Sequence, residues 1–285
     1  MRVAVPGGEL AVVEHTPFAG AGPPILCLHG FPDVPSSFAP LARLLTAAGR
    51  RVVAPWLRGY HPSTLAGPFT AERLADDLLA VADVVSPGEP VDVIGHDWGA
   101  LATYTACAVR PERIRRAVTL AVPHPAAFMH NVPRQPFQLR RSWYMLFFQL
   151  PHAAEWALMR RDGALIERLW HDWSPGWSPP PGHLDEVKRA LTASMPAPLE
   201  VYRTMFQQVV AGARPPGRIE VPTLALHGAR DGCVGAHLGD GQARFFRDLR
   251  AEIVDEVGHF LHLERPALVA ERALEWFAIP LAHAV

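Results

Sequence analysis

An aspartate stands at the centre of the motif Gly95-His96-Asp97-Trp98-Gly99, where the common pattern G-x-S-x-G has a serine. The motif follows a short apolar segment and opens an alanine-rich, helix-like one. A sharp strand-to-helix turn of this kind is a nucleophile elbow, which exposes the central side chain. With a reference pKa of about 3.9, a carboxylate is already charged at neutral pH and can attack without losing a proton. Asp97 therefore indicates the opening of a bond at a saturated carbon rather than acyl transfer.

An acid and a histidine, the partners that such a nucleophile needs, follow two later strand-like segments. Asp231 stands in a turn after the segment Thr223–His227, and His259 follows the predicted strand Glu252–Val257. The order nucleophile, acid, histidine accompanies this type of elbow. Because the carboxyl ends of parallel strands meet at one edge of a sheet, we expect Asp97, Asp231 and His259 to lie close together.

Other carboxylates near the end of the chain are less suited to the role of the acid. Asp240 and Asp248 are expected on the solvated face of a following helix, and Asp255 falls inside a predicted strand. The alternative location, after the preceding strand, is the segment Ala121–Pro125, which holds no carboxylate. Asp231 is therefore the preferred acid.

The loop His29-Gly30-Phe31-Pro32 follows the apolar segment Ile25–Leu28 and is the candidate oxyanion loop. With a nucleophile elbow, such a loop supplies one backbone N–H to the oxyanion, and the residue after the nucleophile supplies the other. These donors would be the amides of Phe31 and Trp98. A tight Gly-Pro turn without a catalytic role is the alternative.

The segments that must position these residues alternate between strand-like and helix-like patterns. Such alternation predicts an α/β fold in which a mostly parallel sheet is flanked by helices. The expected strands are Ile25–Leu28, Arg51–Ala54, Val91–Ile94, Ile114–Val122, Thr223–His227 and Glu252–Val257. The expected helices are Ser37–Ala48, Ala71–Val85, one around Ala236–Leu249, and Pro266–Phe277.

The middle of the chain has a different character. It lacks good strand candidates, contains many prolines and holds five of the eight tryptophans. Helical periodicity is visible in Trp143–Leu150 and in Leu199–Val210. We therefore expect residues 1–125 and 215–285 to form the core domain and residues 126–214 to form a helical lid, or cap domain.

Together these motifs resemble the α/β-hydrolase superfamily, in its epoxide hydrolase branch, over residues 24–277. Enzymes of this branch use an aspartate nucleophile, and its epoxide hydrolases carry two lid tyrosines that hydrogen-bond the epoxide oxygen. The segments Ser142–Pro151 and Pro198–Arg203 resemble those that bear the tyrosines, and they contain Tyr144 and Tyr202. The resemblance implies an epoxide hydrolase that forms an ester on Asp97 and needs no cofactor and no metal. Substrate contacts are expected from Phe31, Trp98, Tyr144 and Tyr202.

The loop Ala54–Ser63 departs from the family pattern at two positions. Trp56 stands where the family usually has an aspartate, and His61 stands where it usually has a glycine. These changes concern the packing of the loop and the shape of the substrate, and they leave the catalytic set intact.

Two other classes of function remain as alternatives. A haloalkane or haloacid dehalogenase would share Asp97, Asp231 and His259 and could hold the departing halide with the indole of Trp98. Many haloalkane enzymes place an asparagine after the His-Gly pair, where this chain has Phe31. A non-catalytic receptor that keeps the fold is disfavoured because the nucleophile, the base, the acid and the tyrosine pair are all present.

Composition agrees with an enzyme that acts on small molecules. The chain has 285 residues, 49% of them hydrophobic, which is enough for one large α/β domain or a domain with a substantial insertion. A net charge of -1 argues against a nucleic-acid role and gives no general attraction to anionic membranes. Its three cysteines are too few and too scattered for a disulfide framework or a zinc site, and Cys27 and Cys107 are expected in the core.

The start of the chain lacks the charged and apolar stretches of a secretory signal, and no segment approaches the roughly 18 apolar residues of a membrane span. The expected location is the cytoplasm, and the expected partners are a small, apolar epoxide and water. The pattern leaves open whether the protein is a monomer or a homodimer.

Overall fold

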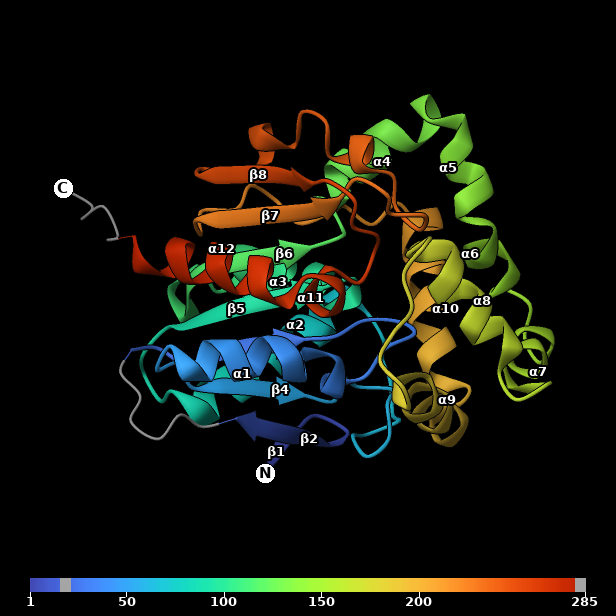
Figure 1. Ribbon diagram of the computed structural model, residues 1–285, viewed down its shortest axis with the longest axis horizontal. Helices are drawn as coiled ribbons and strands as arrows, with labels where there is room; N and C mark the ends of the chain where they lie inside the picture. Colours follow the sequence, from blue (N-terminus) through green and yellow to red (C-terminus); the bar gives the residue numbers. More distant parts are fainter. Residues whose placement is uncertain (16–21, 280–285) are drawn as a thin grey trace.

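An eight-stranded sheet runs through the centre of the computed structural model, which describes residues 1–15 and 22–279 (Figure 1). The strand order is β1-β2-β4-β3-β5-β6-β7-β8. The six strands from β4 to β8 in this order pair in parallel, and β1 and β2 are antiparallel at one edge. The strands are β1 Arg2–Val5, β2 Gly8–His15, β3 Ile25–Leu28, β4 Val52–Pro55, β5 Val91–His96, β6 Ile114–Leu120, β7 Thr223–Gly228 and β8 Leu249–Val254.

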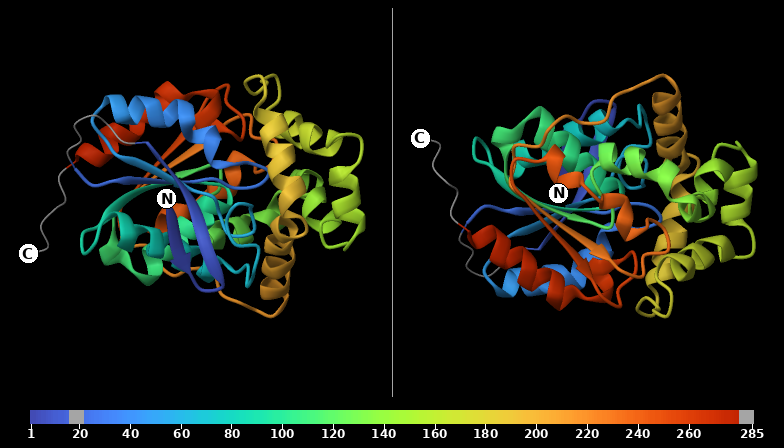
Figure 2. Two further views of the ribbon diagram at one scale, coloured as in Figure 1. Left: turned by 90° about the horizontal axis from the view of Figure 1, so that it is seen from below. Right: turned by 90° about the horizontal axis from the view of Figure 1, so that it is seen from above.

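Helices cover both faces of the sheet, which confirms the predicted fold class (Figure 2). On one face lie α1 (Ala39–Ala47) and α12 (Pro266–Ala278), and on the other lie α2 (Ala71–Val85) and α3 (Trp98–Val109). All four residues of β3 are buried, because alternate side chains of a strand point to opposite faces and helices cover both. The core therefore consists of two apolar layers on either side of one sheet.

Between β6 and β7 the chain forms a succession of helices, which we call the insertion (residues 125–210). The insertion lies beyond the arrowheads of the parallel strands, at the carboxyl edge of the sheet (Figure 1). Its helices are α4 Pro125–Asn131, α5 Pro136–Arg141, α6 Trp143–Phe147, α7 Ala153–Met159, α8 Ala164–Trp173, α9 His183–Ser194 and α10 Ala197–Val210. The division of the chain into a core domain and a cap domain at the boundaries given above stays a prediction.

The segment before β8 differs from the prediction. Residues Ala236–Gly239 and Gln242–Phe245 form two 3-10 turns instead of a helix, and Gly241 between them has a φ of 71°. Strand β8, Leu249–Val254, begins and ends three residues earlier than expected. Asp255 therefore lies just beyond the strand. The reason is that β8 is an edge strand in which only one of six residues is buried, which weakens the apolar pattern that marks a strand.

Smaller differences concern the ends of elements. The predicted strand to Val122 stops at Leu120, and the predicted helix from Ser37 is a 3-10 turn, Pro35–Phe38, that leads into α1. Strands β1 and β2 were not predicted, because β1 has only four residues and at least half of the residues in each of the two strands are exposed or only partly buried. The remaining short elements are the 3-10 turns Pro111–Arg113 and Val132–Arg134 and the helix α11, Leu261–Glu264.

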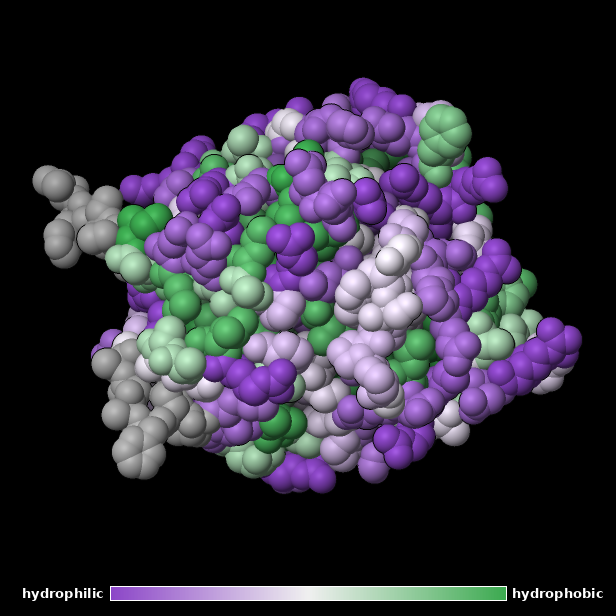
Figure 3. Space-filling view, viewed as in Figure 1, coloured by the Kyte–Doolittle hydropathy of each residue, from purple (hydrophilic) through white to green (hydrophobic). Residues whose placement is uncertain are grey.

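Hydrophilic and hydrophobic residues are interspersed over the face of the molecule seen in Figure 3. On the insertion, the exposed apolar residues include Phe137 and Trp156. No helix among the described residues is long and apolar enough to cross a membrane. Cys27 and Cys107 are buried, as predicted.

Candidate active site

Asp97 occupies the single residue between the end of β5 and the start of α3. Its backbone has a φ of 51° and a ψ of −115°, a region in which a residue with a side chain is strained. The turn is held by hydrogen bonds: the Asp97 carbonyl accepts from the amides of Ala100 and Leu101, and the Asp97 amide donates to the carbonyl of Leu120. The surrounding structure thus imposes the strained turn that presents the carboxylate at the sheet edge.

Two glycines leave the space that this turn needs. A Cβ atom on Gly99 would lie 2.2 Å from the carbonyl oxygen of Leu28, so only glycine lets α3 approach β3 this closely. A Cβ atom on Gly30 would lie 2.2 Å from Oδ1 of Asp97. The backbone of the loop after β3 is therefore packed directly against the side chain of Asp97.

The backbone amide of Phe31 donates a hydrogen bond of 2.8 Å to Oδ1 of Asp97. An amide in this position can stabilise negative charge on that oxygen, as an oxyanion hole does. The corresponding role of the Trp98 amide stays a prediction.

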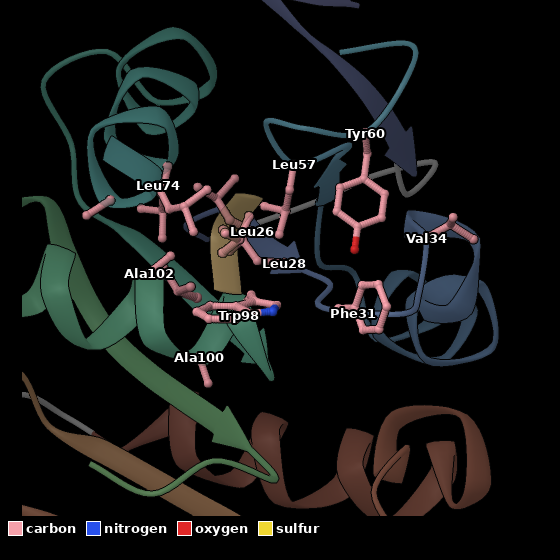
Figure 4. Close-up of a cluster of buried hydrophobic side chains, with 14 of the residues drawn as sticks. Leu26, Leu28, Phe31, Val34, Leu57, Tyr60, Leu74, Trp98, Ala100 and Ala102 are labelled. Atoms are coloured by element: carbon pink, nitrogen blue, oxygen red, sulfur yellow. The ribbon is translucent and has the colours of Figure 1, made fainter. Parts of the chain in front are cut away.

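Figure 4 shows the indole nitrogen of Trp98 and the hydroxyl of Tyr60 turned toward Phe31. The Tyr60 hydroxyl donates to the carbonyl of Gly30, which supports the same loop.

His259 and Asp231 form a buried pair at the ends of neighbouring strands. Nδ1 of His259 lies 2.8 Å from Oδ2 of Asp231, and both side chains are buried. The other oxygen of Asp231 accepts hydrogen bonds from the amides of Cys233 (2.7 Å) and Val234 (2.8 Å). The acid is therefore fixed by its own turn, and it fixes the orientation of the imidazole.

The second ring nitrogen of His259, Nε2, faces Asp97, with 3.8 Å to Oδ2. Burial alone lowers the pKa of His259, but the charges of Asp231 and Asp97 and the Asp231 hydrogen bond outweigh it and raise this pKa from 6.5 to about 10. His259 is thus an imidazolium in the free protein near neutral pH. The structure brings together the three residues that the sequence analysis selected as nucleophile, acid and base.

Tyr144 and Tyr202 lie on separate helices of the insertion, Tyr144 on α6 and Tyr202 on α10. Their ring centroids are 5.9 Å apart, and the Tyr202 ring lies 4.8 Å from that of Trp98 and 5.3 Å from that of Phe31. Burial first of all raises the pKa of both phenols well above 10, and the charge of Asp97 adds to the rise. Both hydroxyls therefore keep their protons at neutral pH.

Cys233 is a site residue that the sequence analysis did not single out. Its sulfur lies 3.2 Å from the hydroxyl of Tyr144, and its side chain is fully buried. The available signal was its position two residues after Asp231, in the turn that carries the acid. Ser174 was missed as well: its hydroxyl accepts a hydrogen bond from the backbone amide of His259, and no motif marks it.

Two groups of buried side chains have the donor types of a metal site, with one ligand atom per residue within 4.8 Å of the others. In each group a histidine already contacts the aspartate: Nδ1 of His259 pairs with Asp231, and Nε2 of His262 pairs with Asp33. Among the described residues, these groups are Asp33, His96 and His262, and Asp231, Cys233 and His259. Both groups therefore act as hydrogen-bond networks that support the site.

Residues 23–266 match the family described as the alpha/beta hydrolase fold, which is most of the chain. The chain belongs to the α/β-hydrolase family. Epoxide hydrolase 3 of Xenopus tropicalis is 30% identical over 256 residues, which are 86% of this chain and 68% of that protein. This relative places the chain in the epoxide hydrolase branch of the α/β-hydrolases.

Further likenesses agree with membership of the α/β-hydrolase family. The AB hydrolase superfamily protein YfhM of Bacillus subtilis (strain 168) is 28% identical over 275 residues, which are 93% of this chain and 94% of that protein. A crystal structure of Bacillus megaterium epoxide hydrolase in complex with an inhibitor shares the fold with a TM-score of 0.85 at 21% identity, covering 98% of this chain and 100% of that one.

Proposed function

We propose that the protein is an epoxide hydrolase that converts a small, apolar epoxide to a vicinal diol. The observation that carries this proposal is the pair of buried phenols, Tyr144 and Tyr202, placed opposite a carboxylate nucleophile. Opening an epoxide leaves an alkoxide, which is a poor leaving group unless a proton donor meets it. Two phenols that stay protonated in an apolar enclosure supply such donors.

The first step is attack by a carboxylate oxygen of Asp97 on one ring carbon of the epoxide. As the carbon–oxygen bond of the ring breaks, its electron pair stays on the ring oxygen, and a phenol hydroxyl of Tyr144 or Tyr202 gives that oxygen a proton. The products are a hydroxyalkyl ester on Asp97 and a phenolate. Aromatic rings around the site, such as Phe148 and Trp173 beside Tyr144, fit an apolar substrate.

The second step is hydrolysis of the ester. Once Asp97 is esterified, its negative charge no longer supports the imidazolium, so the pKa of His259 falls. The imidazolium proton can then return to the phenolate, and neutral His259, oriented by Asp231, takes a proton from water. The water attacks the carboxyl carbon of Asp97, and the Phe31 amide stabilises the oxyanion. The ester bond between this carbon and the alkyl oxygen then breaks, and the leaving alkoxide takes the second proton of the attacking water. The diol is released, and the Asp97 carboxylate and the His259 imidazolium are restored.

The test is diol formation from a panel of styrene-type, fatty and terpenoid epoxides. Asp97→Asn should abolish diol formation, and Tyr144→Phe and Tyr202→Phe should each slow it by roughly 10- to 100-fold, within the range of general acid catalysis. Tyr104→Phe is the matched control, because Tyr104 is equally buried but bonds Thr119 and Val122 in the core. If no epoxide yields a diol, or if Asp97→Asn keeps the activity, the proposal is wrong.

A dehalogenase is the second candidate, and one observation favours it. The indole nitrogen of Trp98, the residue after Asp97, is buried and makes no well-formed hydrogen bond within the described part of the chain, so it could bind a halide. The two functions separate in the Tyr144→Phe variant. Halide release from a haloalkane should keep its rate in this variant, whereas epoxide opening should slow by roughly 10- to 100-fold.

A further inference from the structure

The turn that carries the acid is joined to the insertion through one cysteine. Cys233 donates its amide to Asp231, and its carbonyl accepts a hydrogen bond of 2.8 Å from Nε2 of Gln138 on α5. Oε1 of Gln138 in turn accepts from the amide of Gly235. The backbone of Cys233 is therefore fixed from both sides, and its side chain lies 3.2 Å from the hydroxyl of Tyr144.

We propose that Cys233 is a positioning residue for Tyr144: its thiol donates a hydrogen bond to the Tyr144 hydroxyl, which directs the phenolic proton to the epoxide oxygen. The inference rests on the proposed function and deepens it. A tyrosine hydroxyl has one proton to donate and can accept from another donor. If Tyr144 donated to the sulfur, its proton would point away from the substrate, so the productive arrangement is S–H to oxygen.

The surroundings of Cys233 keep its proton in place. Burial, followed by the charges of Asp231 and Asp97, raises the pKa of the thiol well above 9. The thiol is therefore protonated, and able to donate, in the free protein. In the ring-opening step the Tyr144 proton moves to the substrate oxygen, and the S–H group keeps its own proton. Its hydrogen bond then ends on a phenolate and becomes charge-assisted, which strengthens it.

A positioning role and a merely structural role predict effects on different steps. Tyr144 takes part in the ring opening, which forms the ester on Asp97. The backbone of Cys233 supports Asp231, which takes part in the hydrolysis of that ester. Loss of the thiol should therefore slow formation of the ester, whereas a disturbed acid turn should slow its breakdown.

The experiment measures the rate of ester formation in single turnovers, by intact-protein mass, in a His259→Gln background that retains the ester. We expect Cys233→Ala to slow ester formation roughly 10-fold, as expected for loss of a hydrogen bond to a charged group. Cys233→Ser, which keeps a donor, should stay within about 3-fold of the parent. Cys107→Ala is the matched control, because Cys107 is also a buried thiol but lies on α3, away from the turn of Asp231, and it should leave the rate unchanged.

A double-mutant cycle provides the second measurement. In a Tyr144→Phe background, Cys233→Ala should change the rate of ester formation by less than about 2-fold, because the thiol then has no hydroxyl to orient. The inference would be overturned if Cys233→Ala formed the ester at the rate of its parent. It would also be overturned if Cys233→Ala lowered this rate equally in the presence of Tyr144 and in the Tyr144→Phe background. Accumulation of ester in Cys233→Ala with His259 intact would also overturn it. If the His259→Gln parent forms no ester at all, the proposed function itself fails.

Discussion

Nε2 of His259 and Oδ2 of Asp97 are 3.8 Å apart, a separation that allows attraction between charges but is too long for a hydrogen bond. Nε2 has no hydrogen-bond partner within residues 1–15 and 22–279. In the proposed mechanism this spacing couples the state of the imidazole to the charge of the nucleophile. Formation of the ester removes the charge of Asp97, and His259 becomes a base at the step that needs one.

The stability of the protein should fall as the pH rises above 6.5. The pKa of His259 is raised to about 10 in the folded protein from its ordinary 6.5, so folding is favoured by protonated His259 below pH 6.5. That contribution, on the order of a few kcal/mol, is lost as the pH rises through 10. Urea unfolding at pH 6.5 and 9.5 measures the loss. His259→Gln should show a much smaller loss, and equal losses in both proteins would contradict the assignment.

Gly30→Ala should inactivate the enzyme while leaving it folded. The added Cβ would lie 2.2 Å from Oδ1 of Asp97 and must displace either the carboxylate or the Phe31 amide that binds it. A displacement of this size in an active site costs roughly 100-fold in rate. Gly217→Ala is the control, since nothing lies within 4 Å of a Cβ at that position. Diol formation by Gly30→Ala at the rate of the control would show that this contact does not matter.

Asp77→Ala should destabilise the fold by about 3–5 kcal/mol, because it leaves a buried arginine without a counter-charge. Arg58 binds both oxygens of Asp77 and the carbonyls of Ala66 and Pro6, and the two charged side chains are almost fully buried. The neighbouring Asp76→Ala removes only a surface ion pair with Arg73 and should cost less than about 1 kcal/mol. Chemical denaturation of both variants provides the comparison, and similar losses would refute the prediction.

The sequence predicted the parts of the site that depend on strand ends. Asp97, Asp231 and His259 each follow a parallel strand, and the topology of such a sheet brings the ends of these strands together. The strand before His259 was misplaced by three residues, but its histidine was identified from the glycine before it and from the chain order. The position of a candidate catalytic residue relative to a turn was thus predicted more accurately than the bounds of the strand before it.

The sequence pattern does not predict which side chains of separate elements come into contact. That Cys233 touches Tyr144 depends on how α6 packs over the acid turn, and no local spacing encodes this packing. The same holds for Ser174, which lies after α8 and binds the amide of His259. The tyrosines were found only through the resemblance of their segments to a family, since a tyrosine on an apolar helix is otherwise compatible with a place in the core.

The central claim is that Asp97 forms a covalent ester with an epoxide, and intact-protein mass spectrometry of His259→Gln tests it most directly. On incubation with an epoxide that the wild-type protein converts to a diol, we expect a mass increase of one substrate per chain, located on the peptide that contains Asp97. The variant that also carries Asp97→Asn should show no increase. An unmodified His259→Gln protein with every epoxide that the wild type converts would contradict the claim.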